Sequence, residues 1–188
     1  MPGTLAGLLA GLQLFVSLFF PAAVIGRLQT GEWLRFHVIA PDDTAEMQRL
    51  KLIVRDAVQD AYRQRRTPGS ASMQEEAVRL LPELTAAARE AARNAGYPGA
   101  VAISLTEQVF SERQLGRLRI PAGTYPALVI RLGDARGQNW WGLLDPELSL
   151  AFAGIPETDD GDVIQWDWSL RTLLYALLGR PLPPMEGA

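Results

Sequence analysis

The longest apolar run of the chain lies near its N-terminal end, in residues 5–26, which carry no charged side chain. A run of this length can cross the hydrocarbon core of a membrane, and it also fits the apolar core of a long signal peptide. Small residues cluster around Ala23 and Gly26, the two candidate cleavage positions. We therefore expect a signal peptide or a membrane anchor in residues 1–26, and a buried core helix is the remaining alternative.

A short strand and a long amphipathic helix are predicted next. Residues 33–39 alternate between apolar and polar side chains, which is typical of a strand with one buried face. Apolar residues then recur at helical spacing from residue 47 to residue 61. Asp43 and Glu46 stand three residues apart before this pattern, so they predict a capping box with Asp43 as the N-cap.

A second helical region follows a Pro-Gly turn. Ser72 and Glu75 form another capping-box pair, and the helical pattern extends through an alanine-rich stretch to Asn94. Pro82 lies inside this pattern, where its ring and its missing N–H disfavour a continuous helix. We therefore expect a kink or a break near Leu81.

The second half of the chain is rich in strand patterns. Apolar runs bounded by turn residues predict strands at residues 100–109, 118–120, 128–132 and 140–144. The glycine loop 133–137 joins the last two runs, so they are predicted to pair as a β-hairpin. Most of these strands are joined by short turns, which favours antiparallel pairing.

Together these elements predict an α+β fold, with two N-terminal helices packed on a largely antiparallel sheet and a short C-terminal helix at residues 169–178. The chain has 188 residues, which suits one domain, and it shows no internal repeat or dividing linker. Beyond the N-terminal segment we expect a single domain in residues 27–180 and a disordered tail in residues 181–188.

Composition narrows the range of functions. The net charge is −3, and the one basic cluster, at residues 63–66, fits the C-terminal end of a helix, so nucleic-acid binding has little support. Cysteine is absent, which excludes disulfides and thiolate sites. His37 is the only histidine, and on an alternating strand we expect it to be a partly buried or exposed structural residue. No catalytic residue, metal site or cofactor is predicted.

Trp140 and Trp141 are the clearest candidate binding residues. Adjacent strand residues point to opposite faces of a sheet, so one ring should enter the core and the other should face solvent or a partner. An exposed tryptophan beside Asn139 is either an anchor for a protein partner or a platform for a sugar, unless the domain covers both rings. Arg136 lies on the preceding loop and completes the predicted partner-binding surface.

Several short motifs resemble the stage II sporulation protein R family. Residues 121–128 read Pro-Ala-Gly-x-Tyr-x-Ala-Leu, and the glycine loop that follows ends in Asn-Trp-Trp at residues 139–141. Upstream, Arg-Phe-His-Val-Ile-Ala at residues 35–40 and Val-Arg-Asp-Ala-Val at residues 54–58 look like the first strand and the first helix of the family. The resemblance covers residues 34–150, and its specificity comes from the order of the motifs.

The resemblance implies a signalling role without catalysis. A protein of this kind would leave the forespore and act in the space between the forespore and mother-cell membranes. It would activate a membrane-embedded, aspartic-type protease that processes the precursor of the mother-cell sigma factor, sigma-E. Residues 5–26 would contact the membrane if they are not cleaved. The competing hypothesis is a cell-wall glycan-binding module or a peptidoglycan hydrolase, which would use an exposed tryptophan and paired carboxylates such as Asp145 and Glu147.

The sequence departs from the family pattern in two places. Family members commonly carry cysteines at the positions of Gly142 and Ser149, and their joint absence implies that the pair forms a disulfide in other members. The family element Phe-Pro-x-x-x-Tyr-Gly is altered to Phe-Ser-Glu-Arg-Gln-Leu-Gly at residues 110–116. We therefore expect this loop, and any contact it makes, to differ from the family.

Overall fold

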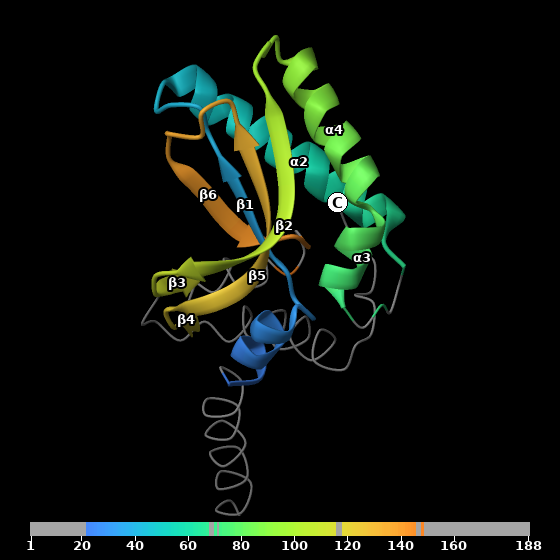
Figure 1. Ribbon diagram of the computed structural model, residues 1–188, viewed down its shortest axis with the longest axis vertical. Coiled ribbons are helices and arrows are strands. Elements are labelled where there is room, and N and C mark those ends of the chain that lie inside the picture. The colour runs from blue at the N-terminus through green and yellow to red at the C-terminus, as the bar shows by residue number, and fades with distance from the viewer. Residues whose placement is uncertain (1–21, 68–69, 71, 116–117, 146–147, 149–188) are drawn as a thin grey trace, which may run out of the picture.

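The computed structural model describes residues 22–67, 70, 72–115, 118–145 and 148 of the chain (Figure 1). The elements are β1 (Arg35–Ile39), α2 (Ala45–Arg65), α3 (Met73–Arg79), α4 (Leu81–Asn94), β2 (Val101–Phe110), β3 (Arg113–Leu115), β4 (Leu118–Ile120), β5 (Gly123–Leu132) and β6 (Asn139–Leu143). Residues 22–30 form a further helix. The α+β class is therefore confirmed, while the expected C-terminal helix and tail lie outside the described residues.

Four strands form a mixed sheet in the order β2-β5-β1-β6. β2 is antiparallel to β5 and β6 is antiparallel to β1, but the two central strands, β1 and β5, run parallel. β3 and β4 form a separate antiparallel pair, of which β3 was not predicted (Figure 1). The sheet is thus mostly antiparallel, and its one parallel contact lies at its centre.

The predicted hairpin between the last two strands is wrong. β1 lies between β5 and β6, so that His37 pairs with Val129 on one side and with Trp141 on the other. The glycine loop 133–137 therefore crosses the end of β1 instead of making a tight turn between neighbours. Sequential strands usually lie side by side, which is why the hairpin was expected, but here the earlier strand β1 takes the central place.

The helix boundaries follow local rules. Ser72 caps α3, because its hydroxyl accepts a hydrogen bond from the Glu75 N–H at 3.2 Å. The break near Leu81 is confirmed, since α3 ends before it and α4 begins there with Pro82 in its first turn. Proline is tolerated at that position because the first N–H groups of a helix have no partner within the helix.

The N-cap of α2 is one residue later than predicted. Thr44, not Asp43, caps the helix, and its hydroxyl accepts a hydrogen bond from the Met47 N–H at 3.4 Å. The Asp43 carboxylate instead accepts a hydrogen bond from the backbone N–H of Gln138 at 2.6 Å. Asp43 thus ties the start of α2 to the chain just before β6, a long-range contact that local capping rules do not foresee.

Replacing Thr44 with alanine is expected to lower the free energy of unfolding by about 1 kcal/mol, because the first turn of α2 loses its side-chain acceptor. Urea unfolding of the two proteins measures the difference. Thr44→Ser keeps the hydroxyl and serves as the control. An unchanged urea midpoint for Thr44→Ala would show that the cap contributes nothing.

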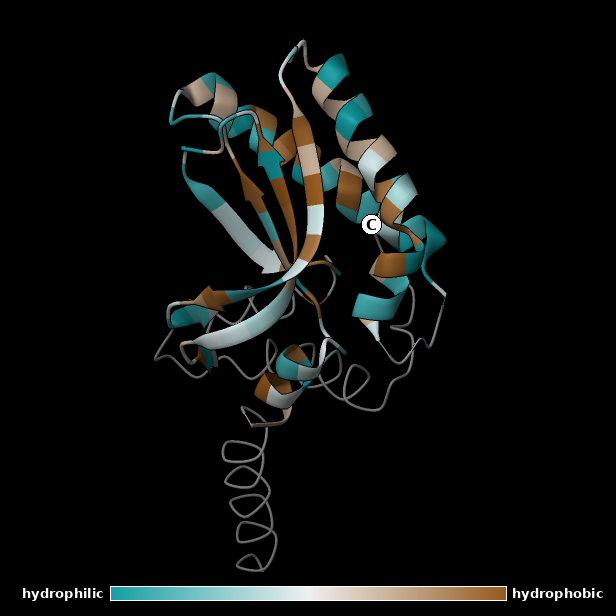
Figure 2. Cartoon of the chain, viewed as in Figure 1, coloured by the Kyte–Doolittle hydropathy of each residue, from teal (hydrophilic) through white to brown (hydrophobic). Residues whose placement is uncertain are grey.

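Apolar clusters cover both faces of the sheet. The first lies between the sheet and the helices and includes Phe36, Val38, Leu128, Ile130, Leu50, Val54, Val58, Leu84 and Ala88. The second lies on the opposite face and consists of Val24, Leu28, Trp33, Ile120, Tyr125, Leu143 and Leu148. In Figure 2 the central strands are mainly brown, whereas α4 mixes teal and brown positions, as a helix with one covered face should.

The helix at residues 22–30 belongs to the folded part of the chain. Val24 and Leu28 are fully buried in the second cluster, although Val24 precedes the expected domain start at residue 27. Among the described residues, no helix is long and apolar enough to cross a membrane. Most of the apolar run at residues 5–26 lies outside them.

Candidate functional site

The alternation of β1 sends polar side chains to the sheet face that α2 and α4 do not cover. Phe36 and Val38 point into the helix-side cluster, whereas Arg35 and His37 point the other way. Neighbouring strands add aromatic and amide side chains on that same face. We name this group the Arg35 cluster; it consists of Arg35, His37, Phe110, Tyr125, Asn139 and Trp141.

Arg35 is a buried cation inside a ring of aromatics. It is 1% exposed, and its guanidinium carbon lies 3.7 Å from the ring centre of Phe110, 5.0 Å from that of Tyr125 and 5.9 Å from that of Trp141. None of its guanidinium nitrogens has a hydrogen-bond partner among the described residues. Burial lowers the pKa of Arg35 to about 10, so the side chain is still charged at neutral pH.

His37 is more deeply buried than we predicted. It is 2% exposed and stacks on Phe110, with ring centres 4.5 Å apart and planes inclined by 19°. Its Nδ1 lies 2.7 Å from the side-chain nitrogen of Asn139, while its Nε2 has no hydrogen-bond partner in the described part of the chain. Burial first, and then the charge of Arg35, lowers the pKa of His37 to about 4. His37 is therefore neutral at pH 7.

The structure places Asn139 at the rim of the cluster. Its residue is exposed, yet its side-chain amide reaches the buried His37 ring. The amide therefore links the solvent-accessible edge of β6 to the interior of the Arg35 cluster. This role could not be read from the sequence, because His37 and Asn139 are 102 residues apart.

The two tryptophans point to opposite faces, as predicted, but the expected division into one core ring and one outward ring is wrong. Both are half-buried. Trp140 packs edge-on against Phe36, with ring centres 5.6 Å apart, and Arg55 lies over its ring at 5.0 Å. Trp141 belongs to the Arg35 cluster. Each ring thus packs against described residues on its own face of the edge strand β6, and part of its surface stays accessible.

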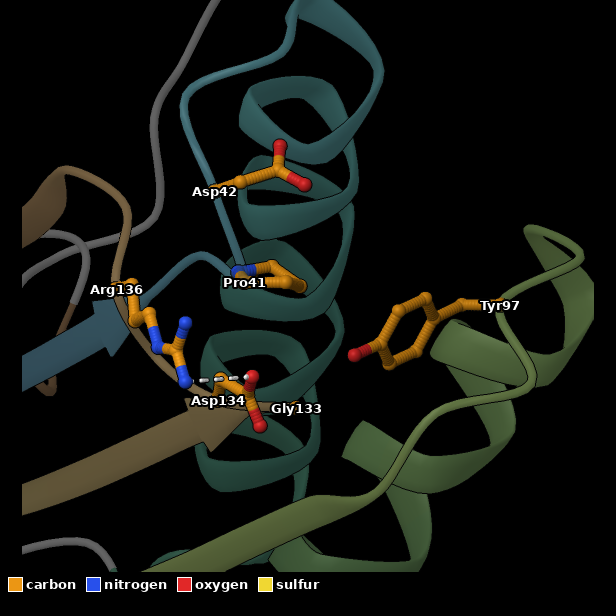
Figure 3. A pocket seen from close by; sticks show the side chains of 6 residues that line it. All are labelled: Pro41, Asp42, Tyr97, Gly133, Asp134 and Arg136. Atoms are coloured by element: carbon orange, nitrogen blue, oxygen red, sulfur yellow. Dashed lines mark ion pairs between the residues drawn. The ribbon is translucent and has the colours of Figure 1, made fainter.

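Arg136 lies apart from the cluster, at the end of the sheet. It lines a pocket of about 440 Å³, shown in Figure 3, together with Pro41, Asp42, Tyr97, Gly133 and Asp134. Arg136 pairs with Asp134 at 3.3 Å, and both are largely exposed. The Asp42 carboxylate accepts hydrogen bonds from the N–H and hydroxyl of Thr44, which lowers the pKa of Asp42. Because these charged groups already have partners within the protein, we assign no ligand to this pocket.

The carboxylates considered for hydrolysis are not brought together in the described part of the chain. Asp145 is buried and pairs with Arg66, while Glu147 lies outside the described residues. Ser149, one of the two positions where the family has cysteine, also lies outside them. No group of three or more histidine, aspartate or glutamate side chains that could hold a metal ion occurs among the described residues.

Arg35, Phe110 and Tyr125 were not predicted as site residues. The available signal was the alternation of β1, in which Arg35 and His37 occupy every second position between fully buried apolar residues. A charged residue at such a position of a central strand must be buried, which is unusual for arginine. The alternation does not reveal that β1 is a central strand, so the burial of Arg35 could not be predicted from it.

Comparisons with known proteins identify the family. The family model described as stage II sporulation protein R matches residues 30–153. A stage II sporulation protein R from Bacillus subtilis (strain 168) is 32% identical over 119 residues, which are 61% of this chain and 52% of that protein. The chain thus spans about half the length of this curated relative, and no solved structure matches it. Because the family match extends over more than half of the sequence and includes the whole Arg35 cluster, the chain belongs to the stage II sporulation protein R family.

Proposed function

We propose that this protein is an exported sporulation signal that activates a membrane-embedded, aspartic-type protease by binding to it. The protease then processes the precursor of sigma-E in the mother cell. The observation that carries this proposal is the family match over residues 30–153, which extends across every strand from β1 to β6. The family supports a role in sporulation; the signalling step, the protease and its substrate are the proposed part.

Activation of the protease by binding alone requires that the signal bind the active state of the protease more tightly than the inactive state. A binding protein shifts its partner toward the active state only as far as it binds that state more tightly. Moving an equilibrium from 1:99 to 99:1 needs roughly 10⁴-fold tighter binding to the active state, or about 5.5 kcal/mol. A few well-packed residues at the centre of an interface can supply a difference of this size.

We place the protein in the space between the forespore and mother-cell membranes. The uncharged apolar run at residues 5–26 supports export, either as a cleaved signal or as an anchor that keeps contact with the membrane. N-terminal sequencing of the mature protein distinguishes these two forms. Cleavage after Gly26 would also remove Val24 from the second apolar cluster, whereas cleavage after Ala23 would leave it.

Complementation is the test of the signalling function. The full chain is expressed in a sporulating host that lacks its own family member, and cleavage of the sigma-E precursor is followed by immunoblot. Restored cleavage is the expected result. An exported and folded chain that restores no cleavage, even when it is expressed together with the protease of its own species, would contradict the proposal.

Asn139 is the site residue best placed to contact the partner, since it is exposed at the rim of the Arg35 cluster. Asn139→Ala is expected to reduce precursor cleavage about tenfold, the effect of losing roughly 1.4 kcal/mol of binding free energy. Asn94, an exposed amide on α4, provides the matched control, and Asn94→Ala should signal normally. Normal signalling by folded Asn139→Ala would remove this residue from the partner-binding surface.

A further inference from the structure

The Arg35 cluster contains a charge that the described fold does not neutralise. Arg35 is buried, charged at neutral pH and without a hydrogen-bond partner among the described residues. The aromatic rings around Arg35 offset only part of the cost of burying its charge. The attraction between a cation and a ring is weaker than the hydration free energy that the cation loses on burial. Within the described residues, the three guanidinium nitrogens of Arg35 therefore have hydrogen bonds left to make.

A second polar group without a hydrogen-bond partner among the described residues lies on the same face of β1 as Arg35. The Nε2 of His37 also has no hydrogen-bond partner among the described residues. With Nδ1 accepting from the Asn139 amide, the neutral imidazole carries its proton on Nε2, so this atom is a donor like those of Arg35. An anion can only accept hydrogen bonds, so a group of donors with no acceptor among them suits an anionic ligand.

Phe110 contacts both groups. Its ring is the nearest aromatic ring to the Arg35 guanidinium and stacks on His37. Phe110 itself is only half-buried, because it ends β2 at the edge of the sheet. Rotation of this one side chain would withdraw a ring that contacts both donor groups and would leave the backbone of the sheet in place.

We propose that Arg35 binds a carboxylate group, supplied by an aspartate or glutamate side chain of the partner protein, and that Phe110 is the cover of this site. A planar guanidinium matches the two oxygens of a carboxylate with paired hydrogen bonds. His37 is neutral, so Arg35 is the one cation within the cluster, and the exposed Arg113 nearby adds positive charge that favours an anion further. The identity of the partner rests on the proposed function, whereas the carboxylate chemistry does not.

Formate is the probe for the carboxylate site. The full chain, purified in mild detergent at pH 7, is unfolded with urea in sodium formate or in sodium chloride at equal ionic strength. At a formate concentration tenfold above its dissociation constant, the unfolding equilibrium constant should fall about elevenfold. Phe110→Ala removes the cover and should produce the same effect at lower formate concentration.

Variants at two arginines of one sheet face give the matched comparison. Arg35→Met should lose the formate effect and be at least as stable as the parent in chloride, because an unpaired buried charge is removed. Arg131→Met removes a half-buried cation that donates a hydrogen bond to the Ser104 hydroxyl on β2. This variant should keep the formate effect. If Arg35→Met does not fold, Arg35→Lys keeps the charge but loses the planar fork, and its formate affinity should fall at least tenfold.

Three results would overturn the proposal. Equal stabilisation of the parent and Arg35→Met by formate, or no stabilisation of either the parent or Phe110→Ala, would exclude the carboxylate site.

In the complementation assay Arg35→Met should reduce precursor cleavage at least tenfold while Arg131→Met has no effect. Formate binding combined with normal signalling by Arg35→Met would exclude the partner as the source of the carboxylate. A parent chain that does not signal contradicts the proposed function, and the formate assay still decides the site.

Discussion

Lowering the pH from 7 to 4.5 is expected to reduce the free energy of unfolding by roughly 2 kcal/mol through His37 alone. The pKa of His37 is lowered to about 4 in the folded protein, mainly by burial and further by the charges of Arg35 and Arg113. In the unfolded chain an ordinary histidine has a pKa of about 6.5. Between these two values the unfolded chain binds a proton that the folded protein does not. The contribution of His37 to the free energy of unfolding is therefore fully present above pH 6.5 and is lost as the pH falls toward 4.

The single histidine makes this prediction easy to check. Urea unfolding of the parent and of His37→Gln is measured at several pH values between 4.5 and 7. The glutamine variant has no group that titrates in this interval at position 37, so the difference between the two pH profiles isolates His37. The parent should lose more stability on acidification than the variant. Parallel profiles would mean that the ring is more exposed to solvent than the structure shows.

Gly137→Ala is expected to lower the free energy of unfolding by about 3 kcal/mol, or to prevent folding. A Cβ at this position would lie 2.2 Å from the carbonyl oxygen of Asp42 and 2.6 Å from its carbonyl carbon. Both are backbone atoms, so they cannot rotate away as a side chain could. The N–H of Gly137 also donates to the carbonyl of Ala40 at 3.0 Å, which fixes the crossing loop to the end of β1.

A second variant in the same loop provides the control with the opposite sign. Ala135 has a φ of 51°, in the left-handed region that glycine adopts at little cost. Ala135→Gly is therefore expected to raise the free energy of unfolding by about 1 kcal/mol. Urea midpoints at pH 7 measure both variants. A Gly137→Ala protein as stable as the parent would show that the loop can move away from Asp42, and hence that it does not fix the position of Asn139.

The elements that could be predicted from the sequence depend on neighbouring residues. The Ser72 cap, the break at Pro82 and the alternation of β1 were all recognisable, since each is set by side chains within a few positions. The same local rules misplaced the N-cap of α2 by one residue. Asp43 was available to cap that helix, but its carboxylate is used by Gln138, which lies 95 residues away.

The chemistry of the candidate site was only partly predictable for the same reason. Asn139 and Trp141 could be predicted as candidates, because an exposed tryptophan beside an amide can anchor a protein partner. Arg35 and Phe110 were not, because they come together only after β1 has been placed between β5 and β6. No local pattern specifies which strand occupies the centre of a sheet.

The class of the fold, the ends of most helices, the buried faces of β1 and β2 and, through short motifs, the family could all be inferred from the amino-acid sequence. These properties depend on side-chain periodicity and on interactions within one or two turns of chain. The strand order, the burial of Arg35 and His37, and the contact of His37 with Asn139 emerge only when the whole chain has folded. Burial, and with it the pKa of a side chain, depends on what distant segments place around that side chain, and periodicity carries no information about them.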